Sequence, residues 1–280
     1  MELFLDSNKN WITDKQIKGT LMQLGADQCD YLFIHTSLNF GIPNPSLKRT
    51  ELMECLMQVF RELGVKNILM PTFTFSFCNR RDYNPLTSSS KMGALNEYFR
   101  KQPDVIRSID PLMSVALLGE DADLVKGVGH YSCGENCTYD KLHHRQNVKF
   151  LMFGPQIGAC MTYMHYLEWL FGVDYRYDRA FVGNIDNGNG VYRDEYQLFT
   201  RYNGVTPNDG SFHYEQIMYE KGLAQHVTLG NANVAVVDEK NATEAYFDCL
   251  QLNPYFFVDL RNGHLVKDKT YIVTDEVVAM

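Results

Sequence analysis

The sequence predicts an α/β fold: a three-layer α/β/α sandwich with a mainly parallel central sheet and a smaller appended α+β subdomain. Short buried strands alternate with helical segments through residues 1–172. Strands separated by helices of about 10 to 15 residues form crossover units, which place helices on both faces of a parallel sheet. From about residue 173, aromatic and charged residues alternate with a period of two, as in half-exposed antiparallel strands. We therefore expect one domain over 1–280, with an α/β core over 1–172 and an α+β part over 173–280.

The elements follow one another along the chain. The first helix begins after Thr13, which forms a capping-box pattern with Gln16, and it ends at Gly25. The other core elements are expected as strand 30–38, helix 46–64, strand 65–73, helix 92–101, strand 113–119, short helix 120–128, strand 148–154 and helix 161–173. The second part is expected as strands 174–181 and 190–202 with a turn-rich connection, helix 211–222, short strands within 226–237, helix 241–251 and a final strand pair.

Composition and charge exclude several classes of partner. The 280 residues carry a formal net charge of -8 and are 45% hydrophobic, which fits a globular protein with a sizeable core. Proteins that bind nucleic acid or an anionic membrane surface present basic patches, so we expect neither partner. The negative charge is compatible with a cationic small molecule such as an amine.

The sequence also carries signals of location. No apolar run approaches the roughly 18 residues of a membrane-spanning helix. The first ten residues have an acid at position 2 and no basic flank, unlike a signal peptide. The seven cysteines are an odd number and widely scattered, so we expect no disulfide framework. These features predict a cytoplasmic protein.

The helical segment MTYMHYLEWLFGV (161–173) carries a base and an acid among mostly apolar residues. Side chains three residues apart lie on one face of a helix, so Thr162, His165 and Glu168 form a stripe. An imidazole with neighbouring oxygens that fix its tautomer can act as a general base. The alternative is a hydrogen-bonded histidine in a helix that packs on the sheet, because a buried histidine or glutamate needs a partner.

Other chemistries have weaker support. His130, Cys133, Cys137, His143 and His144 lie close in sequence, but they do not form the two ligand pairs of a structural zinc site, and we expect no metal. The chain lacks a G-x-S-x-G elbow, a P-loop and a G-x-G-x-x-G motif. We prefer the interpretation that loop 130–144 lends a side chain to a substrate pocket.

Polar residues gather where the predicted strands end. His35, Thr36 and Ser37 follow one strand, and Thr72 and Thr74 follow the next. In parallel sheets, ligands bind beyond the carboxyl ends of the strands. The sequence therefore predicts a ligand site at this edge.

A second polar string lies just before the strand expected at 113–119. Arg107, Ser108, Asp110 and Ser114 surround Pro111. An arginine with hydroxyls and backbone donors can hold an acidic or phosphorylated ligand. For this segment taken alone, a surface loop stabilised by an Arg–Asp ion pair is an equally good interpretation.

Six segments in order carry a family resemblance over nearly the whole chain: FIHTSLNFG (33–41), ILMPTFTFSF (68–77), GALNEYFRKQPDVIRSIDPLMSVALLG (93–119), FLMFG (150–154), TYMHYLEWLFGVDYRYDRAF (162–181) and FHYEQIMYEKGL (212–223). Together they resemble the aminoglycoside 3-N-acetyltransferase family of acetyl-CoA-dependent enzymes. Each segment alone is a weak signal, whereas the ordered set is specific. The resemblance implies a central sheet between helical layers, acetyl-CoA (coenzyme A) as cofactor, an amino-sugar substrate and an acceptor site completed by residues 173–280.

The resemblance also implies roles for individual residues. The implied catalytic residues are His165, Glu168 of the H-x-x-E motif, and Glu215 as a second acid. The implied cofactor-binding residues are His35, Thr36, Ser37, Leu38, Thr72, Arg107, Ser108 and Ser114. The implied substrate-binding residues are Asp110, Tyr163 and Glu135. Because a protonated amine is not a nucleophile, direct acetyl transfer needs a base such as imidazole, with oxyanion donors expected from loops 35–38 or 72–74.

One departure from the family pattern bears on the substrate. The drug-modifying members usually carry histidine where this chain has Asp110, and the segment 133–140 lacks their S-P pair. An aspartate here resembles relatives associated with bacterial surface polysaccharides. We therefore expect a nucleotide-linked amino sugar of lipopolysaccharide biosynthesis, with aminoglycoside acetylation in antibiotic resistance as the alternative.

A non-catalytic binding module and a zinc hydrolase are two alternative classes of protein that the sequence supports less well. The base, its acid and the implied cofactor loops are all present, which disfavours the first. The missing ligand pairs disfavour the second. A homodimer is common among relatives, and no apolar helix face in this sequence requires one.

Overall fold

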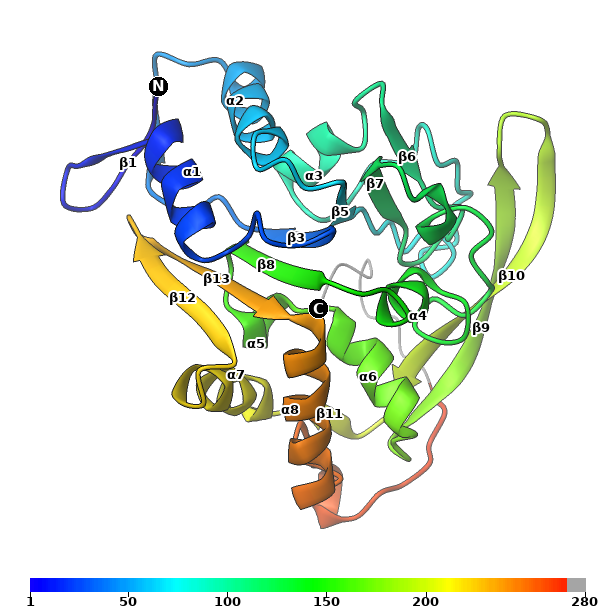
Figure 1. Ribbon diagram of the computed structural model, residues 1–280. Helices are drawn as coiled ribbons and strands as arrows, with labels where there is room; N and C mark the ends of the chain where they lie inside the picture. The colour runs from blue at the N-terminus through cyan, green and yellow to red at the C-terminus, as the bar shows by residue number, and fades with distance from the viewer. Residues whose placement is uncertain (271–280) are drawn as a thin grey trace.

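The fold is built around a seven-stranded sheet. It is seen in a computed structural model that describes residues 1–270 (Figure 1). From edge to edge the strands are β12 (Ala224–Leu229), β13 (Ala232–Asp238), β8 (Val148–Gly154), β3 (Tyr31–Thr36), β5 (Asn67–Pro71), β7 (Val115–Gly119) and β6 (Val105–Arg107). β3 pairs in parallel with β5 and β8, whereas the other neighbours in this sheet are antiparallel. Only β13 and β7 run against the common direction, so the expected mainly parallel sheet is confirmed.

Helices cover both faces of the sheet and make the three expected layers. Successive strand residues point to opposite faces, so Phe33 and Ile34 lie in two separate cores. The face of Ile34 is covered by α1 (Asp14–Gln23), α2 (Arg49–Arg61) and α3 (Ala94–Phe99). The face of Phe33 is covered by α4 (Thr138–His143), α5 (Ile157–Cys160), α6 (Tyr163–Phe171), α7 (Gly210–Glu220) and α8 (Glu239–Leu252).

Several helix boundaries fall where local signals predict them. The Thr13 hydroxyl accepts from the Gln16 amide while the Gln16 side chain accepts from the Thr13 N–H, which confirms the capping box of α1. Gly25 and Gly64 follow α1 and α2 with φ of 72° each, the left-handed conformation common after helices. The segment 120–128 forms only a short 3₁₀ turn, η1 (Ala122–Leu124). Within residues 1–270, no helix is both long enough and apolar enough to cross a membrane.

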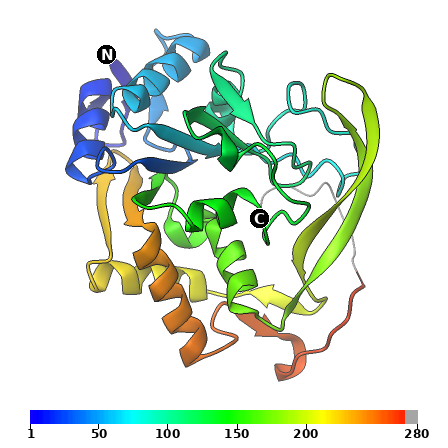
Figure 2. The same ribbon diagram turned by 45° about the vertical axis from the view of Figure 1, so that its right-hand side comes forward.

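The second part of the chain, expected as an α+β subdomain packed on the core, contributes a hairpin and also two strands of the central sheet. β9 (Arg176–Asp186) and β10 (Val191–Arg201) form the expected hairpin, which stands beside the sheet in Figures 1 and 2. β12 and β13, however, extend the central sheet beyond β8, so the division between 1–172 and 173–280 cuts through one sheet. β13 is buried on both sides, with Val234 in one core and Ala235 in the other. Such a strand requires a sheet covered on both faces.

Short strands make two small sheets that the sequence patterns did not reveal. β1 (Glu2–Leu5) pairs with β2 (Trp11–Thr13) and β4 (Ile42–Pro43), and β11 (Val205–Pro207) pairs with β14 (Val258–Leu260). A 3₁₀ turn, η2 (Arg261–Gly263), follows β14. Strands of two to four residues are too short for a period-two signal. The part of the expected final strand pair that falls after residue 270 lies outside the described residues.

The carboxyl ends of β3 and β8 approach each other so closely that residue 154 must be glycine. A Cβ atom on Gly154 would lie 1.8 Å from the carbonyl oxygen of Ser37, and Gly154 has φ of 104°. The Ser37 N–H donates to the Phe153 carbonyl at 2.9 Å, which continues the pairing past Thr36. This approach holds residues 36–38 over the edge where the predicted polar residues gather.

We expect Gly154→Ala to destabilise the protein by about 3 kcal/mol or more, because the new methyl group meets a backbone carbonyl in a strained conformation. Gly64→Ala is the matched control, since Gly64 also has positive φ but has nothing within 4 Å of its Cβ position. It should cost about 1 kcal/mol from backbone strain alone. Urea unfolding of both variants measures the difference, and equal losses would contradict the close approach.

Candidate active site

His165 and Glu168 face each other across one turn of α6. Nδ1 of His165 lies 3.2 Å from Oε2 of Glu168. The Glu168 side chain is 4% exposed and the His165 side chain 30% exposed, so the acid lies inside while part of the imidazole reaches the surface. The helix ends at Gly172, whose φ of 79° is the left-handed conformation of a helix stop. The structure therefore brings together the two residues expected from the H-x-x-E motif.

Two residues that the sequence analysis did not select complete the surroundings of Glu168. Nη2 of Arg176, the first residue of β9, lies 2.8 Å from Oε2 of Glu168 and 3.2 Å from Nδ1 of His165. The Tyr175 hydroxyl donates to Oε1 of Glu168 at 2.9 Å. The alternation over 174–181 indicated only a strand. The signal that could have found Arg176 is the need of a buried carboxylate for a cationic partner.

The charges around this pair set the protonation states of both groups. Burial is the largest effect on His165 and lowers its pKa; the hydrogen bond to Glu168 opposes this shift, while Arg176 and Arg201 add to it. Burial alone would raise the pKa of Glu168, but Arg176, His165 and Tyr175 together hold that pKa at about 2. At neutral pH the site therefore contains an ionised carboxylate beside an uncharged imidazole, as a general base requires.

Thr162 bonds to His35, not to the side chain of His165. Its hydroxyl lies 3.0 Å from Nε2 of His35 and also bonds the Tyr139 hydroxyl, while its backbone N–H donates to the same Nε2 at 3.3 Å. Nε2 thus accepts, and we assign the proton to Nδ1, which is buried and has no hydrogen-bond partner within residues 1–270. Burial lowers the pKa of His35 to about 3. His35 is an uncharged anchor between β3 and α6, a placement that does not favour direct contact with a cofactor.

The remaining residues of the predicted cofactor loop are partly exposed. Thr36 is the last residue of β3, and Ser37 and Leu38 follow it. The Thr36 hydroxyl bonds the Asn96 side chain of α3, and Asn96 in turn donates to the Pro71 carbonyl at 2.8 Å. The loop is therefore fixed between the ends of two strands and a helix, with hydroxyl groups at the carboxyl edge of the sheet.

The other predicted cofactor residues form an internal hydrogen-bond network. Nε of Arg107 donates to the hydroxyls of Thr72 and Ser114, and both of its Nη atoms donate to backbone carbonyls. Ser108 is 1% exposed, and its hydroxyl accepts from the Val115 N–H. These side chains hold the loops around β7 together, which leaves Arg107 little capacity to bind a phosphate.

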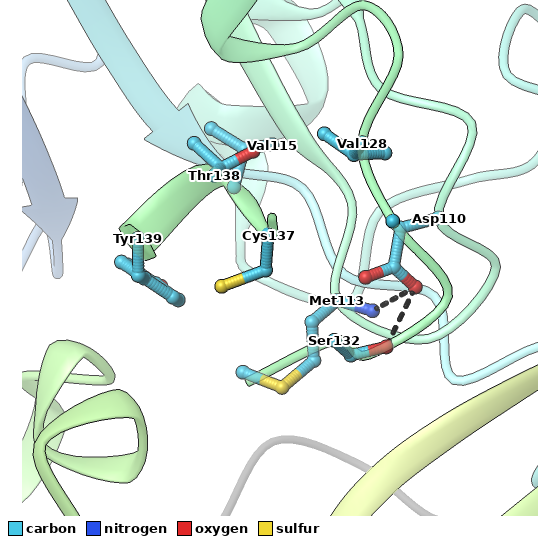
Figure 3. A pocket seen from close by; sticks show the side chains of 9 residues that line it. Asp110, Met113, Val115, Val128, Ser132, Cys137, Thr138 and Tyr139 are labelled. Carbon is cyan, nitrogen blue, oxygen red and sulfur yellow. Dashed lines mark hydrogen bonds between the residues drawn. The ribbon is translucent and has the colours of Figure 1, made fainter. Parts of the chain in front are cut away.

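Asp110 lines a narrow pocket beside loop 128–137 (Figure 3). Its Oδ1 accepts from the N–H groups of Leu112 and Met113 and from the Ser132 hydroxyl, at 2.7, 3.0 and 3.0 Å. Burial raises the pKa of Asp110 in spite of these hydrogen bonds. The pocket is lined by Asp110, Met113, Val115, Val128, Gly129, Ser132, Cys137, Thr138 and Tyr139. Asp110 thus anchors the loop that the sequence assigned to the substrate side.

Tyr163 and Glu135, the other predicted substrate residues, lie in opposite environments. Tyr163 is fully buried, and its hydroxyl bonds Glu239 and Thr243 of α8, which does not favour contact with a substrate. Glu135 is exposed in loop 128–137. A Cβ on the adjacent Gly134 would lie 3.0 Å from the Trp169 ring, so this loop borders the helix that carries His165.

Glu215 lies on α7, with both carboxylate oxygens engaged. Oε2 accepts from the Gly158 N–H at 3.0 Å and Oε1 from the Tyr219 hydroxyl at 2.7 Å. The first contact satisfies a free N–H at the start of α5. Neither oxygen bonds to His165 or Glu168, so the role of Glu215 as a second catalytic acid stays a prediction.

The histidines and cysteines of the 130–144 segment bind separate partners. Each histidine is paired with a different carboxylate: His130 with Asp194, His143 with Glu239 and His144 with Asp140. Sγ of Cys137 accepts from the Asp140 N–H at the start of α4, and Cys133 contacts the sulfur of Met113. In the part of the chain that the structure describes, no three His, Cys, Asp or Glu residues are grouped to hold a metal ion.

Comparisons with known proteins agree with this architecture. The sequence profile described as aminoglycoside 3-N-acetyltransferase matches residues 33–251. The crystal structure of aminoglycoside acetyltransferase AAC(3)-Xa has a TM-score of 0.72 at 18% identity, covering 86% of this chain and 93% of that chain. AAC-IIIb in a binary complex with CoASH has a TM-score of 0.72 at 17% identity, covering 86% and 97%. YokD from Bacillus subtilis has a TM-score of 0.70 at 18% identity, covering 86% and 94%. A comparison with curated proteins finds no match.

The structural neighbours show the shared fold, and the sequence profile shows the family. The profile spans most of the chain, from the middle of β3 to the end of α8. It includes the whole of α6 and the hairpin strand that supplies Arg176. This chain therefore belongs to the aminoglycoside 3-N-acetyltransferase family, which is a family of acyltransferases.

Proposed function

We propose that this protein transfers the acetyl group of acetyl-CoA to an amino group of an aminoglycoside, with His165 as general base. The observation that carries the proposal is the partly exposed imidazole of His165 backed by the buried carboxylate of Glu168. Two neighbours of the same fold support the ligand classes. AAC-IIIb is described with CoASH, and AAC-VIa is described as bound to sisomicin, with a TM-score of 0.72 at 17% identity that covers 86% of this chain and 98% of that one.

The expected preference for a nucleotide-linked amino sugar finds no support in these comparisons, which favour the aminoglycoside alternative. That preference depended on Asp110. In the structure Asp110 accepts three hydrogen bonds that fix loop 128–137 and its own turn. An aspartate at this position therefore has a structural reason that is independent of the acceptor.

The residues of α6 can perform the proton transfer that the reaction needs. When the Nδ1–H of His165 donates to Glu168, Nε2 is left with a free lone pair that accepts the proton of the attacking amine. The charge of Glu168 then stabilises the imidazolium, as the acid of a hydrolase triad does. Because its pKa is lowered, His165 is uncharged at neutral pH and ready to accept a proton.

Acetyl-CoA would supply the activated thioester, and the loop at Thr36, Ser37 and Leu38 fits its binding. This loop is partly exposed, is held rigidly beside Gly154 and presents hydroxyl donors at the carboxyl edge of the sheet. Arg107 and Ser108 contribute by supporting the neighbouring loops, since their polar atoms are engaged inside the protein.

His165→Gln is expected to lower kcat by about 10²- to 10⁴-fold, because it removes the base and keeps the size of the side chain similar. Release of free thiol from acetyl-CoA measures the rate, and calorimetric titration with coenzyme A should show unchanged affinity. His213→Gln, at an exposed histidine of α7, is the matched control and should retain activity. Unchanged turnover in His165→Gln would remove this residue from the mechanism.

The acid limb of kcat/KM is expected below pH 6.5. Burial lowers the pKa of His165 from 6.5, so the uncharged base persists into more acidic solution before protonation stops the reaction. Two acceptors whose amines differ in pKa separate this limb from ionisation of the substrate, since the limb of the enzyme is common to both. A common midpoint at or above pH 6.5 would contradict the assignment.

Aminoglycosides with the ring system of sisomicin are expected to be acetylated with a kcat/KM at least tenfold above that of nucleotide-linked amino sugars. The same thiol-release assay compares the two classes, and mass spectrometry confirms the acetylated product. Efficient turnover of a nucleotide-linked amino sugar alone would restore the other acceptor class and leave the His165 mechanism intact.

A further inference from the structure

Arg176 lies beside the proposed base and its acid and contacts both. Its Nη2 atom lies 2.8 Å from Oε2 of Glu168 and 3.2 Å from Nδ1 of His165, and those two atoms are themselves 3.2 Å apart. The three polar atoms therefore form a triangle in which Arg176 contacts both partners. The general-base mechanism above uses only the other two residues.

The position of Arg176 is fixed by the hairpin. Its side chain is 7% exposed, and Nη1 donates to the Phe199 carbonyl of β10 at 2.9 Å. Its guanidinium carbon also lies 6.0 Å from the centre of the Phe199 ring. Nε is buried without a hydrogen-bond partner within residues 1–270, so the ion pair with Glu168 is the main compensation for burying this charge.

Arg176 and Glu168 make opposite demands on Nδ1 of His165. An ionised carboxylate only accepts hydrogen bonds, so Glu168 favours the tautomer with a proton on Nδ1, which leaves Nε2 free as a base. A guanidinium only donates, so Arg176 favours a lone pair on Nδ1, which puts the proton on Nε2 and disables the base. The balance between these two contacts decides which tautomer is populated.

Arg176 also changes the charge that the imidazole experiences. Glu168 supplies one negative charge near His165, whereas Arg176 and its cross-strand partner Arg201 supply two positive charges. Burial and the proximity of Arg176 lower the pKa of Arg201 to about 10, so Arg201 stays charged at neutral pH. Among residues 1–270, Tyr175, Tyr246 of α8 and Cys133 of loop 128–137 also interact with this cluster, and burial raises the pKa of each, so that they are uncharged at neutral pH.

We propose that Arg176 is a positioning residue that holds Glu168 ionised, keeps His165 uncharged and sets the tautomer of its imidazole. This inference rests on the proposed function for its meaning, because a base must be uncharged before it can take a proton from an amine. Arg176 acts through Glu168 and His165, and it tunes the pH range over which the base works.

The test is a nitrogen-15 NMR titration of the histidines in the protein without acetyl-CoA or acceptor. The shifts of the two ring nitrogens report the tautomer and the midpoint of titration, and His165→Gln identifies the resonances. Arg176→Met is expected to raise the midpoint of His165 by about one pH unit or more and to increase the Nδ1–H tautomer. Arg193→Met, at an exposed arginine of the same hairpin, is the matched control and should change neither. An unchanged midpoint in folded Arg176→Met would overturn the proposal.

Arg176→Lys separates the effect of charge from that of packing. Lysine keeps the positive charge but lacks the planar guanidinium that reaches both partners. The midpoint should therefore stay below pH 6.5 while the tautomer shifts toward Nδ1–H. A midpoint raised as far as in Arg176→Met would show that packing, and not charge, is responsible.

A double variant covers the case in which Arg176→Met does not fold because Glu168 is left unpaired. Arg176→Met combined with Glu168→Gln contains neither buried charge, and its reference is Glu168→Gln alone. His165 should titrate at a higher pH in the double variant than in this reference. Equal midpoints would overturn the proposal.

The titration needs neither cofactor nor acceptor, so its outcome is independent of whether the proposed function is correct. For an acceptor that the protein acetylates, the acid limb of kcat/KM should move up by the same amount in Arg176→Met and return in Arg176→Lys. A one-unit shift makes the rate about tenfold lower on the acid side, while the plateau does not fall, because the Nδ1–H tautomer that serves as the base is more populated. A uniform loss at every pH would indicate a structural role and contradict the proposal.

Discussion

The buried ion pair between Glu168 and Arg176 is the constraint on which the candidate site depends. It joins α6, which carries the imidazole, to the first residue of the β9–β10 hairpin. Removing two charges from water costs several kcal/mol per ion, so such a pair persists only when further hydrogen bonds satisfy both groups. Tyr175 supplies one to Glu168, and the Phe199 carbonyl accepts one from Arg176. The hairpin register therefore controls the surroundings of the base.

A second set of contacts ties the same helix to the sheet. Thr162, just before α6, bonds His35 at the end of β3, and the neighbouring residues of that strand end are held against Gly154. The beginning of α6 is thereby fixed to the strand that continues into the candidate cofactor loop. The turn of α6 that carries Glu168 is fixed to the hairpin through the ion pair with Arg176. An enzyme that brings a thioester and an amine together needs such a constant separation between the loop and the base.

Polar residues that look alike in the sequence have different uses in the fold. Thr36 and Ser37 are partly exposed at the edge of the sheet, whereas Thr72, Ser108 and Ser114 are buried and satisfy one another or the backbone. A hydroxyl in a motif signals a hydrogen bond but not its partner. Resemblance to a family therefore indicated a region of the fold, while only packing separated surface groups from those that hold the loops in place.

Local sequence patterns were enough to predict the caps of α1, the strands β3, β5 and β8, and the shared face of His165 and Glu168. These depend on periods of two and 3.6 residues and on neighbours a few positions away, which local pattern specifies. Three features depend on long-range packing: β12 and β13 join the central sheet, Tyr163 is buried against α8, and Arg176 reaches Glu168. Such contacts arise from strand pairing and from the need to compensate buried charge, and neither can be evaluated before distant segments are brought together.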